Sequence, residues 1–307
     1  MKADLSIILC TYNRAPLLEL ALASIYHQDF DRKQFEVLVV DNNSKDNTPE
    51  VVQSFQAQYT NLLYCKELKQ GLSNARNRGW QEAHGDYVGF LDDDGKASDR
   101  WIETALDIID TIHPAVFGGP YYAYYNTTHP RWFRDEYASL ELGKQARMLR
   151  PGEYLSGGNL FFRKDLIEKA GGFDPSAGMI GQAISYGEET RLLIQIAESY
   201  PDEKLYYDPH LFIYHLVQPY KMTWGWIIRS RFASGRASYR IQSRSYTPVS
   251  WLMNLAYQVL ALPADVAYGL FLRDRTKYTY LQNFIYERGM KHIWSLGMLY
   301  EKMIAKK

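Results

Sequence analysis

Residues 87–94 decide the fold of this chain: they read Tyr-Val-Gly-Phe-Leu-Asp-Asp-Asp, an apolar run that ends in three consecutive aspartates. The apolar residues predict a buried β-strand, and the aspartates follow its carboxyl end directly. Successive side chains at a strand end point in alternate directions, so neighbouring aspartates can meet different ligands. Carboxylate oxygens are the ligands that hard divalent cations prefer. The stretch therefore predicts a ligand site at the end of a strand, whereas three aspartates in an ordinary loop would only be solvated.

Strand and helix signals alternate on either side of this stretch. We expect further strands over residues 5–11, 35–40, 62–65 and 115–117, and helices over residues 16–27, 48–58, 73–83 and 101–110. Such alternation is typical of an α/β fold with a mostly parallel sheet and helices on both faces. In open α/β sheets the ligand lies beyond the carboxyl ends of the strands. Because residues 11–13 and Asp41 follow two other strands, we expect them to converge with the aspartates.

Composition and missing motifs exclude several classes of function. Lys+Arg and Asp+Glu both total 35, so no overall charge favours nucleic acid as a partner. The sequence lacks the motifs of P-loop proteins, dinucleotide-binding enzymes, zinc sites and α/β-hydrolases. Cys10 and Cys65 lie in apolar runs and are expected to be reduced, buried thiols. The amino-terminal apolar run is too short for a signal peptide, which favours a cytoplasmic protein.

The carboxyl-terminal region has a different character. Residues 251–272 are nearly all apolar, and a straight helix of this length, about 33 Å, would be long enough to cross a bilayer. Pro263 and Asp265 lie at its middle, and a charge there costs roughly 3 kcal/mol. We therefore expect two shorter helices in a membrane interface, with a packed hairpin and a spanning helix as alternatives. The flanking cations are Arg240, Arg244, Arg273 and Arg275.

Four polar motifs occur in a fixed order along the first hundred residues. They are Thr11-Tyr12-Asn13-Arg14, Asp41-Asn42-Asn43-Ser44, Gly71 to Asn77 and Asp92-Asp93-Asp94. In this ordered set the chain resembles the family 2 glycosyltransferases, over roughly residues 4–235. The resemblance implies the Rossmann-like GT-A fold, with a mostly parallel mixed sheet that binds a nucleotide sugar. It also implies inverting, metal-dependent sugar transfer from a UDP-sugar.

The resemblance assigns roles to individual residues. Asp94 and His215 are expected to bind the metal, and Asp41 to accept a hydrogen bond from uracil. The residues expected to contact the nucleotide sugar are Thr11, Tyr12, Asn13, Arg14, Asp41, Asn43, Gly71, Arg76, Asp92, Asp93, Gly158 and Asn159. Structural alternatives stay open for three of them: a turn for Asp41, a helix-surface salt bridge for Arg76 and a purely structural histidine at 215.

A catalytic base is expected at the start of a helix near residue 188. The family usually has Glu-Asp there, and this chain has Glu188-Glu189. By helical spacing, Glu189 shares a face with Leu192, Leu193 and Ile196, while Glu188 lies on the wetter side of the helix. We therefore predict that Glu189 removes the proton of the acceptor hydroxyl, with Glu188 as the alternative.

Together these features predict a hexosyl- or N-acetylhexosaminyltransferase that extends a cell-surface glycan on a lipid-linked acceptor. We expect a GT-A domain over residues 1–222, with a nucleotide-binding part (1–120) and an acceptor and catalytic part (121–222). Residues 223–307 are expected to form a helical extension that associates with the inner face of the cell membrane. The alternatives are transfer to a polyprenyl phosphate and a non-catalytic sugar-binding module on the same scaffold.

Overall fold

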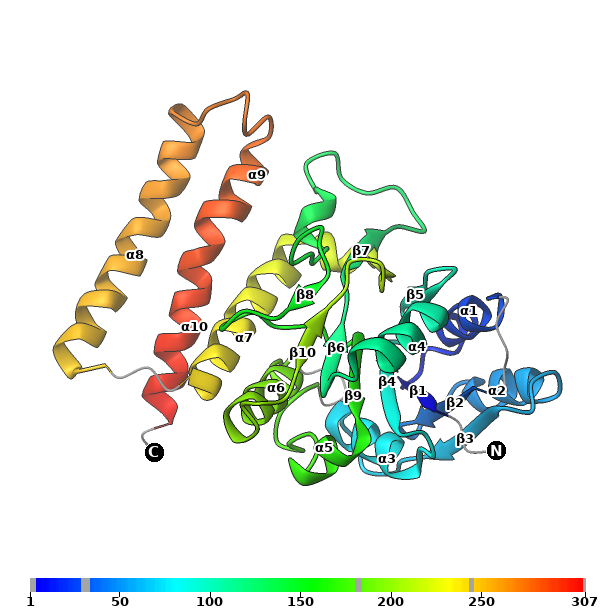
Figure 1. Ribbon diagram of the computed structural model, residues 1–307. Helices are drawn as coiled ribbons and strands as arrows, with labels where there is room; N and C mark the ends of the chain where they lie inside the picture. The colour runs from blue at the N-terminus through cyan, green and yellow to red at the C-terminus, as the bar shows by residue number, and fades with distance from the viewer. Residues whose placement is uncertain (1–3, 29–33, 180–183, 243–245, 306–307) are drawn as a thin grey trace. The chain divides into compact units, whose positions relative to one another are not determined.

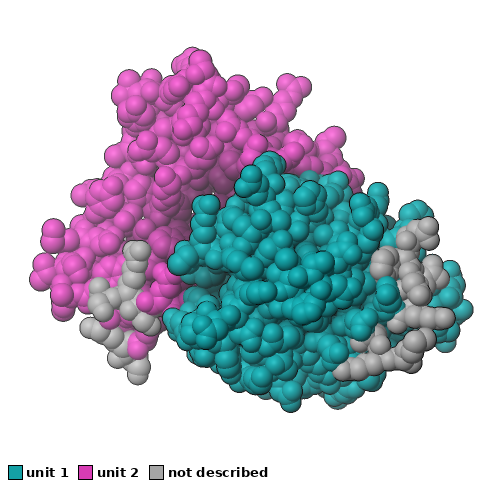
Figure 2. Space-filling model, viewed as in Figure 1, with its two compact units in different colours: residues 1–124, 138–181, 188–216 teal, residues 125–137, 182–187, 217–307 magenta. Residues whose placement is uncertain are grey.

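The computed structural model describes residues 4–28, 34–179, 184–242 and 246–305. The chain divides into two compact units, which Figure 2 colours separately. Unit 1 comprises residues 1–124, 138–181 and 188–216, and unit 2 comprises residues 125–137, 182–187 and 217–307. Each unit is described by itself. The expected domain boundary at residue 222 stays a prediction, since unit 2 also includes two earlier segments of the chain.

Unit 1 is built on an eight-stranded mixed sheet in the order β3-β2-β1-β4-β9-β6-β10-β8 (Figure 1). Strands β1, β2, β3 and β4 are mutually parallel, β10 is parallel to β6, and β9 runs antiparallel between β4 and β6. The strand bounds are β1 Leu5–Thr11, β2 Phe35–Asp41, β3 Leu62–Lys66, β4 Tyr87–Leu91, β6 Val116–Gly118, β8 Arg147–Met148, β9 Asn159–Arg163 and β10 Leu205–Tyr207. The expected α/β fold with a mostly parallel sheet is confirmed.

Helices cover both faces of this sheet because successive strand residues point to opposite sides. Within β1, Leu5, Ile7 and Leu9 pack with α1, α2 and α4, whereas Ile8 packs with α3, α5 and α6. The helix bounds are α1 Ala15–Tyr26, α2 Thr48–Gln56, α3 Leu72–Glu82, α4 Trp101–Ile112, α5 Lys164–Lys169 and α6 Glu188–Ser199. The two apolar layers cover the faces of the sheet, and polar residues gather at the carboxyl ends of the parallel strands, where Thr11, Asp41 and Asp93 are buried.

A second, three-stranded sheet begins directly after the aspartates. It consists of β5 (Gly95–Ala97), β11 (Ile213–Leu216) and β7 (Tyr121–Tyr124), in the order β5-β11-β7. Strand β11 pairs antiparallel with β5, so that His215 lies opposite Gly95. This pairing brings a histidine from late in the chain next to the end of β4.

Unit 2 is mainly helical. Its helices are α7 (Trp224–Gln242), α8 (Pro248–Phe271), α9 (Leu281–Phe284), the π-helix Ile285–Gly289 and α10 (Met290–Ile304). Helices α7 and α10 approach closely through two glycines: a Cβ on Gly235 would lie 1.9 Å from Trp294 O, and one on Gly297 would lie 2.1 Å from Phe232 O. Only residues without a side chain allow the two backbones this approach.

The segment 125–137 belongs to unit 2 because its aromatic side chains pack on the helices. Tyr137 stacks on Tyr286 with ring centroids 3.9 Å apart, and Trp132 stacks on Trp224 at 5.1 Å. Arg134 pairs with Glu287 at 3.1 Å. Sequence patterns gave no indication of this docking, since aromatic residues do not reveal which partners they will contact.

The expectation of two short helices over residues 251–272 is wrong. Helix α8 is continuous over 24 residues and contains Pro263 in its interior. A proline inside a helix removes one backbone hydrogen bond and costs about 3 kcal/mol, which packing of α8 against α10 offsets here. Among the described residues, no helix combines the length and the hydrophobicity that crossing a bilayer requires.

Candidate active site

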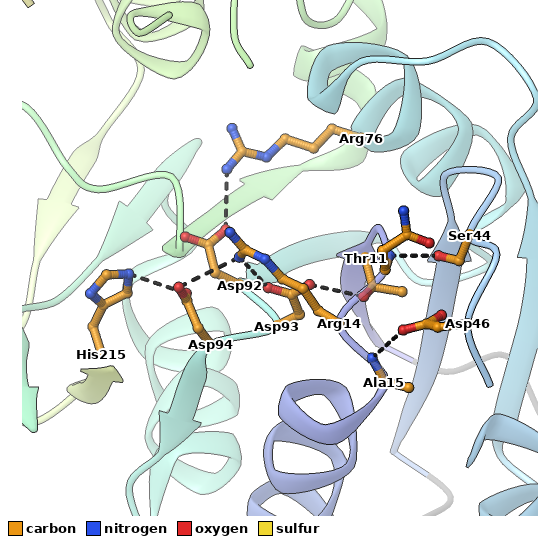
Figure 3. Close-up of polar contacts among 11 residues, drawn as sticks. Thr11, Arg14, Ala15, Ser44, Asp46, Arg76, Asp92, Asp93, Asp94 and His215 are labelled. Carbon is orange, nitrogen blue, oxygen red and sulfur yellow. Dashed lines mark hydrogen bonds and ion pairs between the residues drawn. The ribbon is translucent and has the colours of Figure 1, made fainter. Parts of the chain in front are cut away.

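Three side chains that could bind a metal ion converge near the carboxyl end of β4 (Figure 3). One ligand atom from each of Asp92, Asp94 and His215 lies within 4.8 Å of the others. His215 Nε2 is 3.1 Å from Asp94 Oδ1. Two carboxylates and an imidazole form a donor set that suits Mn²⁺ well and Mg²⁺ through its oxygens. Asp92 thus lies with the two expected metal ligands, and its expected contact with the nucleotide stays a prediction.

Asp93 points away from this group, as the alternation of side chains predicts. It accepts hydrogen bonds from Thr11 Oγ1 at 2.8 Å and from Arg14 Nη1 at 2.9 Å. Arg14 also lies 3.5 Å from Asp94 Oδ2. The pKa of Asp93 is raised to about 6. Burial is the main cause, Arg14 lowers the pKa, and the neighbouring Asp94 raises it. Arg14 therefore offsets part of the repulsion between two buried aspartates.

The loops after β1 and β2 are joined by polar contacts. The backbone N–H of Asn13 donates to Ser44 Oγ at 2.9 Å, and its side-chain oxygen accepts from the N–H of Lys45 at 2.7 Å. Asn13 and Asn43 have φ values of 53° and 66°. Asparagine tolerates this left-handed conformation better than most residues, which explains its presence at both turns. Tyr12 and Asn43 are half-buried beside these contacts.

Asp41 is fully buried and both of its oxygens have partners. Oδ1 accepts from the N–H of Ser44 at 2.7 Å, and Oδ2 accepts from Tyr64 Oη at 2.8 Å. The hydrogen bond from Ser44 forms the turn that the motif at residues 41–44 favours. The turn expected as a structural alternative for Asp41 is therefore present. A carboxylate oxygen can accept more than one hydrogen bond, and the contact with uracil stays a prediction.

Asn42 is a residue that sequence reasoning missed. Its amide donates to the carbonyls of Glu67 and Lys69, and its oxygen accepts from the N–H of Gly71 at 2.8 Å. Gly71, with a φ of 133°, directly precedes α3. Asn42 thus fixes the loop that leads into the helix of Arg76. The feature of the sequence that could have identified Asn42 is its position in the second polar motif, beside Asp41.

Arg76 is the charged centre of the site. Its side chain is 4% exposed and donates from Nη1 to Glu188 Oε1 at 3.0 Å and from Nη2 to Asp92 Oδ1 at 3.4 Å. Nη1 also lies 3.9 Å from Glu189 Oε2. Burial lowers the pKa of Arg76, but the three carboxylates together raise it above its ordinary value. Arg76 is therefore no helix-surface residue: it links the metal-binding group to the glutamate pair.

Two glycines make room for this link. A Cβ on Gly157 would lie 2.7 Å from Arg76 Nη2, and one on Gly158 would lie 2.4 Å from Asp92 Oδ2. The next residue, Asn159, is fully buried. It accepts from Trp101 Nε1 and donates to the carbonyls of Pro120 and Leu211. Its side-chain amide therefore joins parts of the scaffold, and its expected contact with the nucleotide sugar stays a prediction.

The glutamate pair opens α6, but the expected difference in exposure is reversed. The side chain of Glu188 is 6% exposed and that of Glu189 is 22% exposed. Glu188 is covered from outside the helix, by the chain around Gly178, where a Cβ would lie 3.1 Å from Glu188 Cδ. Helical spacing could not reveal this cover. The prediction that Glu188 faces the wetter side is therefore wrong.

Glu189 nevertheless has the properties of a proton acceptor. Burial raises its pKa, and the neighbouring Glu188 raises it further, while Arg76 opposes the change. One oxygen of each glutamate, Oε2, is buried and has no hydrogen-bond donor among the described residues. A carboxylate with a raised pKa and an open lone pair is suited to general base catalysis.

This fold and site define a class of protein: an α/β protein with a group of potential metal ligands at the carboxyl edge of its sheet, which one arginine links to a buried carboxylate pair. Residues 6–171 match the family described as Glycosyl transferase family 2. The chain belongs to this family and is a glycosyltransferase.

Individual relatives agree with this assignment. The chain is 27% identical over 254 residues to a glucosyl-dolichyl phosphate glucuronosyltransferase of Haloferax volcanii, covering 80% of this chain and 79% of the relative. Other curated relatives are matched over a smaller part of their length. The chain spans 55% of the length of one such relative and 37% of the length of another.

Two solved structures show the same fold. The mannosyltransferase PcManGT of Pyrobaculum calidifontis, in complex with GDP-Man and Mn²⁺, has a TM-score of 0.68 at 19% identity and covers 100% of this chain and 89% of its own. TarS of S. aureus, residues 1–349 with UDP-GlcNAc, has a TM-score of 0.58 at 17% identity and covers 98% of this chain and 92% of its own. At these identities the likeness supports the GT-A fold alone.

Proposed function

We propose that this protein transfers a hexosyl or N-acetylhexosaminyl group from a UDP-sugar to a hydroxyl of a glycan or lipid-linked acceptor, with inversion and with Mn²⁺ or Mg²⁺. The observation that carries the proposal is the position of Arg76. Its guanidinium contacts Asp92 on one side and Glu188 on the other, at 3.4 and 3.0 Å. A donor-binding group and a proton-accepting group thus lie on either side of a single cation.

The residues present fit a divalent cation. Asp92, Asp94 and His215 would hold it, and Asp93 would remain with Thr11 and Arg14. When bound, the cation neutralises charge on the diphosphate as the sugar leaves. A divalent cation held there would place positive charge beside Asp92, in addition to the charge of Arg76.

Glu189 is the proposed base. Its Oε2 would accept the proton of the acceptor hydroxyl, whose oxygen forms a bond to the anomeric carbon. The bond from that carbon to the diphosphate oxygen breaks at the same time, and the electron pair leaves with UDP. Attack opposite the leaving group inverts the anomeric configuration, so an α-linked donor gives a β-linked product.

The chemistry of the relatives supports a lipid-linked acceptor. The relative from Haloferax volcanii bears a name that describes action on a dolichyl phosphate-linked glucose. Another relative, 39% identical over 116 residues, is named as acting on a glycan linked to undecaprenol through a diphosphate. We propose a similar acceptor here, in cell-surface glycan synthesis at the inner face of the membrane, with residues 1–222 as the catalytic domain and residues 223–307 as the membrane-associating part.

The donor is tested by measuring release of nucleoside diphosphate with Mn²⁺ from UDP-glucose, UDP-galactose, UDP-GlcNAc, UDP-GalNAc and GDP-mannose. Faster release from one UDP-sugar, abolished by EDTA and restored by Mn²⁺ or Mg²⁺, supports the proposal. Release from GDP-mannose alone would contradict the role of Asp41 with uracil. Product extraction and acid lability distinguish glycan extension from transfer to a polyprenyl phosphate. Absence of turnover with tight donor binding would favour a sugar-binding module.

A further inference from the structure

Helix α8 of unit 2 has its polar residues on the inside. Its polar side chains Asn254, Gln258 and Asp265 lie four and seven residues apart, on the face towards α10. Gln258 is 7% exposed, and Asp265 is 23% exposed at its side chain. A helix on the surface of a water-soluble protein normally has the opposite arrangement, with apolar residues inside.

The inner polar residues are joined into a network around a buried histidine. His292 of α10 is 7% exposed. Its Nδ1 is 2.6 Å from Gln258 Oε1, and its Nε2 is 3.2 Å from Asp265 Oδ2. Asn254 accepts from Gln258 at 2.8 Å, and Arg288 lies 3.7 Å from Asp265. These bonds fix which face of α8 is turned inward and account for its polar side chains.

The outer face of α8 is apolar along its whole length. Its large side chains are between 47% and 81% exposed: Val249, Leu252, Met253, Tyr257, Val259, Leu260, Tyr268, Leu270 and Phe271. Asp265 is the only charged residue among the 24 of the helix, and it faces inward. The result is an uncharged strip about 36 Å long. Exposed apolar patches of this extent mark a surface that contacts another hydrophobic medium.

Charge and aromatic residues at the edges of the strip indicate which medium. Arg275 and Lys277, both exposed, follow the strongly exposed Phe271 and Leu272 at the carboxyl end of the helix. Tyr257 and Tyr268 lie along one border of the strip by helical spacing. Tyrosines at the border and cations at the end complement the headgroup region of an anionic bilayer.

We propose that the outer face of α8 lies in the plane of an anionic membrane, with its apolar side chains inserted below the headgroups. Such in-plane helices insert only to the boundary between headgroups and acyl chains, so no helix needs to cross the bilayer. This inference rests on the proposed function only in naming the membrane as the location of the acceptor. It specifies the surface and the face of the helix that make the contact.

The test is flotation of the full-length protein with vesicles of phosphatidylglycerol and phosphatidylcholine. The test variant is Leu252→Glu/Leu260→Glu/Phe271→Glu, whose three positions are 59%, 71% and 81% exposed and so tolerate charge without unfolding. The matched control is Leu20→Glu, an exposed leucine on α1 of unit 1. We expect the wild type and the control to float, and the triple variant to partition at least about tenfold less.

Two further measurements keep the result unambiguous. Sedimentation without lipid measures the oligomeric state: a dimeric wild type with a monomeric triple variant would overturn the proposal in favour of a copy-to-copy interface. Wild type that does not float with these vesicles would also overturn it. Metal-dependent UDP release in solution reports on the active site separately. Normal release by the triple variant shows that it folds, and loss of release by the wild type would count against the proposed function alone.

Discussion

Both units of this protein bury carboxylates, but they satisfy them differently. In unit 2, Glu301 accepts from Arg236 at 2.6 Å and pairs with Arg240 at 3.2 Å, so each of its oxygens has a cationic partner. In unit 1, the carboxylates of Asp92 and Asp94 lie side by side within the potential metal-binding group, and Glu188 and Glu189 each keep one buried oxygen for which the described part of the chain offers no donor. A buried polar atom without a partner costs about 1–3 kcal/mol. Of the carboxylates to which we assign a function, the glutamate pair thus keeps unsatisfied oxygens, whereas Asp92 and Asp94 are held by Arg76, Arg14 and His215.

The largest expected effect tests the metal-binding side of this comparison. Asp94→Asn keeps the size of the side chain but removes a charged ligand, and we expect a loss of at least about 10²-fold in kcat/KM, because charge stabilisation by a metal contributes several kcal/mol. The free energy of unfolding of Asp94→Asn should stay the same or rise, because the carboxylates of Asp94 and Asp93 repel each other. Steady-state kinetics with Mn²⁺ and thermal unfolding measure the two quantities. Retention of activity in EDTA by this variant would contradict the metal site.

The next effect separates the two adjacent glutamates. Glu189→Gln cannot accept a proton, so kcat should fall about 10²- to 10⁴-fold while affinity for UDP stays near normal. Glu188→Gln weakens one contact to Arg76 and should cost less. Kinetics and calorimetry on both purified variants provide the comparison. An inactive Glu188→Gln variant together with an active Glu189→Gln variant would reverse the assignment. This test is necessary because Glu188 is the more buried of the two glutamates.

Much of the site was predictable because its signals are local. The end of β4, the turn at Asp41 and the loop at Asn13 each follow a strand within a few residues, and parallel strands bring their carboxyl ends together. The contact of Arg76 with Glu188 joins residues 112 positions apart, and the burial of Glu188 comes from a loop outside its helix. Periodicity describes one helix at a time, so it contains no information about such cover. The same limit applies to α8, whose continuity through Pro263 depends on packing against α10.

A third effect concerns the pH dependence of turnover. A general base must be deprotonated, so kcat/KM should rise with pH through the raised pKa of Glu189. Arg76 lowers that pKa; its removal in Arg76→Gln should move the rising limb to higher pH, by about 1–3 units for the loss of an adjacent opposite charge. Arg76→Lys should move it less. A pH–rate profile with saturating metal measures the shift. An unchanged limb in Arg76→Gln would mean that another group sets the profile.

The smallest effect tests the satisfied carboxylate of unit 2. Glu301→Gln makes the same chemical change as Asp94→Asn. Both oxygens of Glu301 are paired with arginines. The side chain of Glu301 is 10% exposed, whereas Arg236 and Arg240 are 34% and 38% exposed, so water screens the two cations once the carboxylate is gone. We therefore expect a loss of only about 1–2 kcal/mol in the free energy of unfolding, less than for a fully buried pair. Urea denaturation measures this loss, and metal-dependent UDP release should stay near the wild-type rate. If Glu301→Gln abolished turnover but left the free energy of unfolding unchanged, a carboxylate with two paired oxygens would also be functional. An oxygen without a partner would then not identify the functional carboxylates of this protein.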